Sequence, residues 1–408
     1  MTISRRGFLG ALVSIPAIGT LFPGSLYGFE VGEDPLGIRK NFALLSDTIY
    51  LNSAYIALCP PSVVRAGCAF QEAKGNQPYS LGQMVDKTEE VRQKFAQFVG
   101  ASPDEIGFIS STSEGENIVV NSLDFKKGDT VVIDDLHYST TFALYRHLEK
   151  TKGIELRIVP NREGRVLLND FASVIDKRTK LVSVAWVSHQ NGFRHDMQAL
   201  ANLAHSHGAL LYTDAIQAVG MFPMNLTEIG LDFLASGTYK WLLAGFGVAP
   251  FYVRKEHLDW IQPDRRGHLH IERDLGNYRY ELYKTAKKFE YATLSFVSIY
   301  QLGASLAYLE QVGVDRIEKH TVSLAWKLRK GLVDLGFKLF TPEGNGSSIV
   351  TFFNPKPYEE TAKIFQDARI QVSFRGENRS QIRVSPALYN NAEDIDLFLA
   401  SAAKLRNF

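Results

Sequence analysis

The stretch Leu210-Leu-Tyr-Thr-Asp-Ala-Ile-Gln217 decides the fold, because it is a short apolar run that ends in polar side chains. Such a run is typical of a buried β-strand. A second run, Phe233–Ala235, leads into Ser236-Gly-Thr-Tyr-Lys240. The carboxyl ends of the strands in an open parallel sheet face the ligand crevice. We therefore expect Asp214, at the end of the first strand, and Lys240, after the second, to meet there.

Outward from this stretch, short β-rich runs alternate with helical segments between about residues 105 and 255. The predicted strands are Ile106–Ser110, Thr130–Ile133, Glu155–Val159, Leu181–Val187, Leu210–Thr213, Phe233–Ala235 and Val248–Val253. The predicted helices between them are 114–124, 139–152, 168–175, 196–207 and 226–230. This alternation predicts parallel βαβ units in one doubly wound sheet.

The rest of the chain predicts a second, smaller lobe. Residues 61–99 and 296–335 carry helical spacing, and strands near 347–353 and 370–374 precede a last helix at 392–405. We divide the chain into a signal (1–28), an N-terminal segment (29–60), a large domain (61–300) and a small α+β domain (301–408). Residues 255–290 are charged and rich in tyrosine, which indicates a loop or a subunit contact.

Composition indicates a small-molecule substrate. The 408 residues carry a formal charge of +1, and 45% of them are hydrophobic. This balance offers no electrostatic reason for nucleic acid or an anionic membrane as a partner. Cys59 and Cys68 are expected to be unpaired thiols without metal-ligand spacing, and we predict no metal site.

The N-terminus resembles a twin-arginine export signal. Ser4-Arg-Arg-Gly-Phe-Leu9 precedes a weakly apolar stretch that ends near Tyr27 and is interrupted by two prolines. No stretch is apolar enough for a stable membrane span. We therefore expect the twin-arginine machinery as a partner and an exported, periplasmic location.

The pair of Lys240 and Asp214 suits pyridoxal 5′-phosphate (PLP). A lysine amine forms a Schiff base with the cofactor aldehyde, and a carboxylate keeps the pyridine nitrogen protonated so that the ring accepts electrons. Either residue alone is common at a strand end. The prediction depends on the two occurring together.

The chain resembles the class V aminotransferase family of fold-type-I PLP enzymes. Asp214-Ala-Ile-Gln217 is similar to the family's Asp-x-x-Gln, and Tyr239-Lys240-Trp241 to its His/Tyr-Lys signature. The resemblance implies a large domain with a mostly parallel seven-stranded sheet flanked by helices, and a smaller α+β domain. It also implies that Lys240 is catalytic and that Asp214 and Gln217 contact the ring, with Thr238 and Tyr239 beside the cofactor.

Further blocks follow in the family's order. Ser111-Thr-Ser-Glu-Gly-Glu-Asn117 resembles the segment that holds the phosphate, which implicates Thr112 and Ser113; it also reads as a plain helix N-cap. His137 matches the residue that stacks on the cofactor, whereas Tyr138 is expected to point elsewhere. The block ending in Thr293 resembles one that reaches the phosphate of a neighbouring subunit, which implies a homodimer with shared sites.

Substrate contacts are implied for four residues. Arg383 matches the arginine that binds the substrate carboxylate, for which its forked guanidinium is suited. Asn52 and Ser53 match a loop that lines the substrate site, and Arg375 is a candidate second positive charge for a diacid. Two alternatives stay open for a residue near the phenolic oxygen of the cofactor: His189 by its spacing to Asp214, and Asn191 by local resemblance.

Three functions remain open from the sequence. The first is an aminotransferase or epimerase-like enzyme that acts at Cα of an amino acid. The second is a PLP-dependent C–S lyase, and the third is a binding protein without activity. The segment Ser373–Arg383 holds no cysteine, and a persulfide mechanism needs a thiolate there. On this ground the sequence argues against a cysteine desulfurase.

Overall fold

The computed structural model describes residues 34–406. The export signal predicted for residues 1–28 lies outside them and stays a prediction. Among the described helices, none combines the length and the apolar character that crossing a bilayer requires.

A seven-stranded sheet forms the centre of the large lobe, in the order β2-β8-β7-β6-β5-β3-β4. Its strands are β2 (Ile106–Ile109), β3 (Thr130–Asp134), β4 (Glu155–Val159), β5 (Thr179–Ala185), β6 (Leu210–Asp214), β7 (Phe233–Ala235) and β8 (Ala249–Val253). Strand β8 runs antiparallel to both of its neighbours, and the other neighbouring pairs are parallel. The mostly parallel sheet is therefore confirmed.

Strand β8 departs from the simple βαβ pattern because no helix separates it from β7. Residues 236–248 form a loop that turns the chain straight back beside β7. A parallel partner would need a crossover connection of a dozen or more residues, usually through a helix. This loop carries Lys240 to the end of the sheet.

Helices cover both faces of this sheet. They are α3 (Thr112–Ser122), α4 (Ser139–Lys152), α5 (Leu168–Ala172), α6 (Met197–Ser206) and α7 (Leu226–Ile229). Alternate residues of β3 enter different cores, with Val132 in one apolar cluster and Val131 and Ile133 in the other. Side chains of a strand point alternately to the two faces, so the sheet is buried on both sides.

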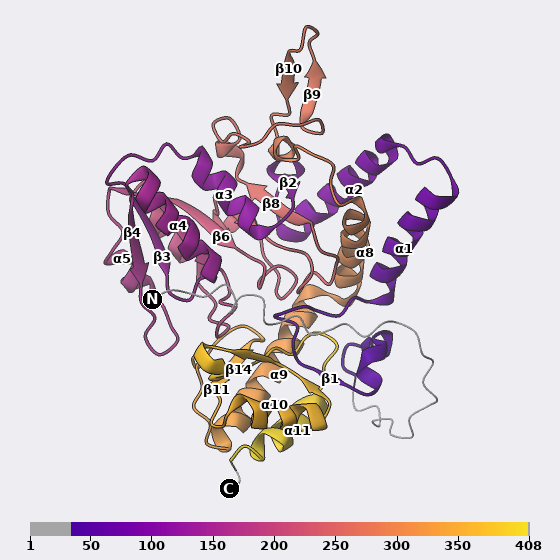
Figure 1. Cartoon of the computed structure of the whole chain (residues 1–408), viewed down its shortest axis with the longest axis vertical. Helices are drawn as coiled ribbons and strands as arrows, with labels where there is room; N and C mark the ends of the chain where they lie inside the picture. Colours follow the sequence, from indigo (N-terminus) through magenta and orange to yellow (C-terminus); the bar gives the residue numbers. More distant parts are fainter. Residues whose placement is uncertain (1–33, 407–408) are drawn as a thin grey trace. The chain divides into compact units, whose positions relative to one another are not determined.

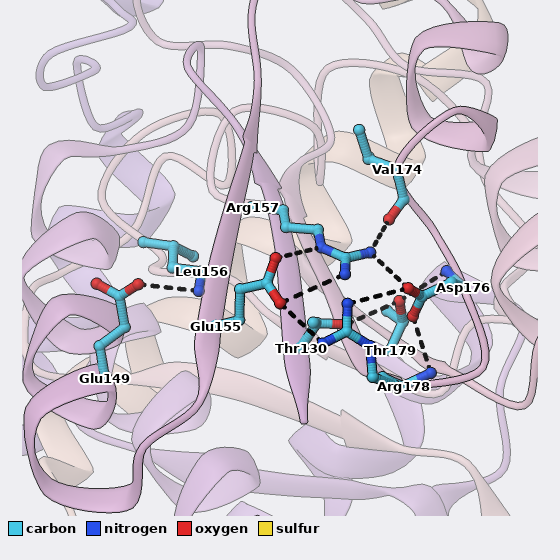
Figure 2. A network of polar contacts seen from close by, with 9 residues as sticks. All are labelled: Thr130, Glu149, Glu155, Leu156, Arg157, Val174, Asp176, Arg178 and Thr179. Atoms are coloured by element: carbon cyan, nitrogen blue, oxygen red, sulfur yellow. Dashed lines mark hydrogen bonds and ion pairs between the residues drawn. The ribbon is translucent and has the colours of Figure 1, made fainter. Parts of the chain in front are cut away.

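Charged side chains surround β4, the strand at the edge of the sheet (Figure 2). Arg157 Nε lies 2.9 Å from Glu155, and its NH1 lies 2.9 Å from Asp176 in the loop before β5. The Glu149 side chain of α4 accepts the Leu156 N–H at 3.0 Å. Charged side chains and occupied edge N–H groups discourage pairing with another chain.

Long helices flank the sheet beside β2 and β8 (Figure 1). They are α1 (Pro61–Asn76), α2 (Leu81–Val99) and α8 (Phe296–Val312), and the next helix, α9 (Val314–Asp334), packs in the core of the small lobe. Helix α2 is capped at its start by Ser80, whose hydroxyl accepts the Gln83 N–H, and at its end by Gly100 with φ 65°. A capping box and a left-handed glycine are ordinary helix boundaries. Short 3₁₀ helices are Arg39–Asn41, Ala43–Ser46, Pro103–Glu105, Lys255–His257, Ala286–Phe289 and Glu377–Arg379.

The small lobe has its own sheet and core. Its elements are β1 (Ile49–Tyr50), β11 (Val350–Phe353), α10 (Tyr358–Asp367), β12 (Ile370–Gln371), β13 (Ser373–Arg375), β14 (Gln381–Val384) and α11 (Ala392–Ala403). Strand β14 lies between β11 and β13, and β1 pairs with β12. The segment around β1 thus packs with the C-terminal lobe. Helix α10 was not predicted.

The predicted loop at 255–290 contains a β-hairpin of β9 (Ile271–Asp274) and β10 (Tyr280–Leu282). Figure 1 shows this hairpin projecting away from the sheet. Tyr278 at its tip is 93% exposed.

Candidate active site

Lys240 lies on the loop between β7 and β8 and is almost fully buried. Burial, followed by the nearby positive charge of Arg383, lowers its pKa from 10.5 to about 7, while Asp214 opposes the shift. Desolvation penalises the charged ammonium form. Near pH 7 about half of this amine is therefore neutral, far more than for an ordinary lysine, and a neutral amine is the form that attacks an aldehyde.

Asp214 ends β6 and lines the same cavity as Lys240. Its Oδ1 accepts the Ile216 N–H at 3.0 Å. Burial raises the pKa of this carboxyl, and the charges of His137 and Lys240 act against that rise. Asp214 and Lys240 were expected to meet because each follows the carboxyl end of a predicted strand. The structure places both in one cavity. The cavity has a volume of about 260 Å³.

The first turn of α3 borders this cavity. Thr112 and Ser113 both line it, and the Ser111 hydroxyl caps the helix by accepting the Glu114 N–H at 3.2 Å. Thr112 Oγ1 accepts the Gly237 N–H at 3.1 Å, which joins α3 to the loop of Lys240. The first N–H groups of a helix have no intrahelical acceptor and attract anions. The N-cap and phosphate-binding interpretations of this segment are compatible.

The expectation that Tyr138 points away from the site is wrong. Tyr138 lines the cavity, whereas His137 is buried and does not belong to the lining. Hydrogen bonds hold the His137 ring in place: Nδ1 accepts the Tyr138 N–H at 2.7 Å, and Nε2 lies 3.1 Å from Ser183 Oγ. Tyr138 is also the N-cap residue of α4, and its side chain makes no capping hydrogen bond there.

Gln217 and Tyr239 line the cavity, but Thr238 does not. The Gln217 amide donates to Ala54 O at 2.9 Å and accepts from Trp241 Nε1 at 2.7 Å, which fixes its orientation. Tyr239 stacks on Phe246 with ring centroids 4.5 Å apart.

Thr238 has a structural place in the loop. Its hydroxyl donates to Gly245 O at 2.6 Å and lies 3.1 Å from Val248 O, and the residue is fully buried. A single hydroxyl proton is committed to these carbonyls. The Thr238 hydroxyl therefore shapes the loop of Lys240, and its proton is not available to a cofactor.

Arg383 lies beside the cavity with a buried guanidinium. Its NH1 donates to His189 O at 2.6 Å and NH2 to Ser373 Oγ at 3.4 Å, while Nε is buried without a partner. Burial lowers its pKa well below the usual value, and Arg375 adds to this shift. Among residues 34–406 no carboxylate forms an ion pair with Arg383, so the guanidinium is available for an anion.

Arg375 carries a second positive charge near this guanidinium. It is largely buried, its Nε has no partner, and its guanidinium lies 5.7 Å from the centre of the Tyr55 ring. Burial lowers its pKa. Within residues 34–406 no carboxylate forms an ion pair with either arginine, so this side of the site carries two positive charges, and a guanidinium is suited to bind an anion.

Asn52 and Ser53 support the site from outside the cavity lining. Asn52 Oδ1 accepts the Ser373 hydroxyl at 2.5 Å, and Ser373 in turn contacts Arg383. The Ser53 hydroxyl lies 2.7 Å from the Tyr389 hydroxyl and is fully buried. Asn52 thus orients the candidate carboxylate-binding arginine through Ser373.

The structure separates the two alternatives left open near the phenolic oxygen. His189 lines the cavity, and its Nδ1 is buried without a hydrogen-bond partner. Burial, with the charges of Arg383 and Lys240, lowers its pKa well below the usual value, so the imidazole is neutral. The amide of Asn191 donates to Gly164 O at 2.8 Å, away from the cavity lining. Of the two, His189 is thus the one that lines the cavity, and its contact with the cofactor stays a prediction.

Thr293 is exposed and lines a separate groove of about 90 Å³. This groove shares Ser110 and Gly247 with the cavity. The implied contact of Thr293 with a neighbouring subunit stays a prediction, as does the homodimer.

The residues of the cavity fit PLP. A buried neutral amine suits the aldehyde, a carboxylate at a strand end suits the pyridine nitrogen, and the first turn of α3 suits the phosphate. No group of three or more His, Cys, Asp or Glu side chains in the described chain is placed to hold a metal. Cys59 and Cys68 are unpaired, as expected, and neither lines the cavity.

Sequence reasoning missed Glu116, which is buried and lines the cavity. It lies within the predicted phosphate segment, one helical turn after Thr112. Residues four apart on a helix share a face, and this spacing was the available signal.

Comparison with known proteins identifies the family. Residues 49–398 match the family described as Aminotransferase class-V. The chain belongs to this family. Its members depend on PLP, so PLP is the cofactor of this chain.

Curated relatives carry two kinds of name. A probable cysteine desulfurase from Methanothermobacter thermautotrophicus is 30% identical over 383 residues, which cover 88% of this chain and 95% of that protein. An uncharacterized aminotransferase from Bacillus subtilis is 29% identical over 315 residues, covering 77% and 82%. The apo structure of a cysteine desulfurase from Thermococcus onnurineus NA1 has a TM-score of 0.83 at 27% identity, and covers 92% and 99%.

These relatives overturn the exclusion of desulfurase chemistry. The exclusion rested on the lack of a cysteine in Ser373–Arg383, whereas relatives across nearly the whole chain are named cysteine desulfurases. The presence or absence of one residue type in one segment does not decide which reaction a shared fold supports. The argument against a desulfurase was therefore wrong.

Proposed function

We propose that this PLP enzyme cleaves the C–S bond of a cysteine-type amino acid. The observation that carries the proposal is the buried Lys240 amine with its pKa lowered to about 7, which shares a cavity with Asp214 and lies near the Arg383 guanidinium, for which residues 34–406 supply no ion-pair partner. This arrangement suits an α-amino acid, whose amino group is taken up at Lys240 and whose carboxylate is taken up at Arg383. The names of the relatives support sulfur as the leaving atom.

Each residue has a defined task in this proposal. PLP bound in the cavity supplies an electron sink for negative charge at the substrate Cα. Asp214 holds the proton of the pyridine nitrogen, and the α3 first turn holds the phosphate. Arg383 orients the substrate through its carboxylate. Lys240, once free, accepts the Cα proton.

In the elimination reaction, the C–S bond breaks and the sulfur leaves with both bonding electrons. Loss of the Cα proton to Lys240 and departure of the sulfur as a thiolate leave an unsaturated three-carbon fragment. Water converts this fragment to pyruvate and ammonia, and no oxidant is needed. Transfer of the sulfur to an acceptor thiol would instead leave alanine.

The holoenzyme tests this proposal directly. We expect incubation with L-cysteine or L-cystine to release sulfide or persulfide together with pyruvate or alanine, and the Lys240→Ala variant to release neither. The ratio of pyruvate to alanine separates elimination from sulfur transfer. Absence of sulfur release from a protein that contains PLP would contradict the proposal.

Transamination is the second candidate, supported by the relative from Bacillus subtilis that is named an aminotransferase. It predicts conversion of the cofactor to its pyridoxamine form and restoration by an α-keto acid. Absorbance spectra during a single turnover distinguish this outcome from sulfur release.

A further inference from the structure

Glu116 presents a buried carboxylate to the cofactor cavity. The residue is 5% exposed and lines the same cavity as Asp214 and Lys240. Across residues 34–406, no lysine, arginine or histidine forms an ion pair with it. The segment that contains Glu116 resembles the one that holds the cofactor phosphate in the family. The Glu116 side chain nevertheless contacts a different set of partners.

Three hydroxyl groups from α4 and β5 converge on this carboxylate. Oε1 accepts from Ser183 at 2.6 Å and from Tyr145 at 2.9 Å, and Oε2 accepts from Thr141 at 3.0 Å. Each hydroxyl has one proton to donate. The hydroxyls therefore supply three hydrogen bonds to a group that can accept all of them when it is ionised.

The hydrogen bonds of His137 fix the direction of the Ser183 proton. The Tyr138 N–H donates to His137 Nδ1 at 2.7 Å, so Nδ1 carries no proton and Nε2 carries it. Nε2 lies 3.1 Å from Ser183 Oγ, which accepts this proton as a hydrogen bond and donates its own to Glu116. Glu116 is thus an acceptor in all three contacts, the pattern of an ionised carboxylate.

Packing alone does not explain this arrangement. An ionised carboxylate without a cationic partner is costly to bury, and an apolar side chain would fill the same space. The residues that follow on α3, Ile118 and Val119, show that this helix otherwise buries apolar groups. The charge at Glu116 therefore needs a function that an apolar residue would not provide.

We propose that Glu116 is a positioning residue whose negative charge, held by Ser183, Tyr145 and Thr141, keeps the proton shared by Asp214 and the pyridine nitrogen of PLP. The inference rests on the proposed seating of PLP at Lys240 and Asp214.

The charges around Asp214 support this role. Burial is the largest cause that raises the pKa of Asp214, and the charge of Glu116 raises it further. His137, Lys240 and the Ile216 N–H act in the opposite direction. A second negative charge in the cavity disfavours loss of the proton from the Asp214–pyridine pair. Glu116 thus acts on the pKa of Asp214 in the direction opposite to His137 and Lys240.

Nitrogen-15 NMR of holoenzyme loaded with PLP labelled at the pyridine nitrogen tests the proposal. The chemical shift of this nitrogen reports its protonation, and it is followed from pH 6 to pH 10 in the wild type and in Glu116→Gln. We expect the variant to lose the ring proton at a pH lower by about one unit, equivalent to about tenfold weaker proton binding. The shift is to lower pH because removal of a nearby negative charge lowers the proton affinity of the pyridine nitrogen.

Two further variants separate charge from structure. Glu116→Met also removes the charge and should show the same shift, even if Glu116→Gln folds poorly. Ser183→Ala keeps the charge and should titrate within about 0.3 pH units of the wild type, a small fraction of the tenfold effect.

Wild-type titration in both charge-removing variants, or an equal shift in Ser183→Ala, would overturn the role of Glu116. Failure of the proposed C–S cleavage has a different signature, namely no sulfur release from a wild type that contains PLP and titrates as expected. Failure of the seating of PLP at Lys240 would show as no labelled PLP on the peptide containing Lys240 after borohydride reduction of the wild type.

Discussion

Replacement of Arg383 by lysine tests how the substrate carboxylate is recognised. The guanidinium is 1% exposed, its NH1 and NH2 are held by His189 O and Ser373 Oγ, and its Nε is unpartnered. A fork of this kind donates two parallel hydrogen bonds to a carboxylate, and lysine keeps the charge but loses the fork. Loss of one charge-assisted hydrogen bond costs about 2–3 kcal/mol, which corresponds to a fall of about 30- to 150-fold in kcat/KM.

The assay compares kcat/KM for sulfur release by wild type, Arg383→Lys and Arg375→Lys, each with its PLP content measured. We expect Arg383→Lys to lose activity toward every amino acid. Arg375→Lys should lose about tenfold only toward substrates with a second acidic group, because its guanidinium is the second unpaired charge beside the site.

A fall of less than threefold in Arg383→Lys, with full PLP content, would refute carboxylate binding at this residue. Equal losses in Arg375→Lys toward substrates with one and with two acidic groups would remove the second anionic subsite. Borohydride-reducible PLP in both variants serves as the control that Lys240 and the cofactor cavity remain intact.

Two further predictions concern Lys240 and the buried ion pair of Glu290. Because the pKa of Lys240 is lowered from 10.5 to about 7, the free amine forms at lower pH than in an ordinary lysine. The rate at which apo-protein captures PLP should rise with pH with a midpoint near 7 rather than near 10.5, as followed by stopped-flow absorbance; a midpoint above 9 would contradict this account. Glu290 contacts Arg92 at 2.6 Å and accepts the Phe108 N–H at 2.8 Å, with both charged side chains buried. Glu290→Gln should lower the unfolding free energy by about 3 kcal/mol in urea denaturation, whereas Glu281→Gln on the exposed hairpin should change it by less than about 0.5 kcal/mol. A loss below about 1 kcal/mol at Glu290 would show that the pair contributes little.

The pattern of short apolar runs in the sequence predicted most strands of the main sheet. The runs at 130–133, 155–159 and 233–235 correspond to β3, β4 and β7 within one residue. Buried parallel strands are short apolar runs whose limits are marked by polar residues. Strand-end reasoning also paired Asp214 with Lys240, and both line one cavity. The C-terminal ends of parallel strands meet at one edge, whatever the details of packing.

Some short or exposed elements were missed or misread. Helix α10 is a short amphipathic helix that buries Thr361 and Phe365, with Ile364 packed against the same core, and this helical spacing was overlooked. The hairpin of β9 and β10 is largely exposed and carries little apolar alternation. The direction of β8 depends on the absence of a crossover helix after β7, which no single strand sequence reveals.

Side-chain direction in the site was decided by partners far apart in the chain. His137 and Tyr138 are neighbours in sequence, and only the contacts of His137 with Ser183 and the Tyr138 N–H determine which ring enters the cavity. Thr238 is only two residues from Lys240 in sequence, but its hydroxyl donates to Gly245 O within the same loop. Glu116 acquires its role from hydroxyl groups on α4 and β5.

The sequence alone determined the alternation of strands and helices in the large lobe, the PLP family and the pairing of an amine with a carboxylate, because these depend on local pattern and on short motifs. Only the tertiary structure decided which side chains face the cofactor cavity and which charges lack a partner. Burial and hydrogen bonds between distant segments set both properties, and neither is encoded at any one position of the chain.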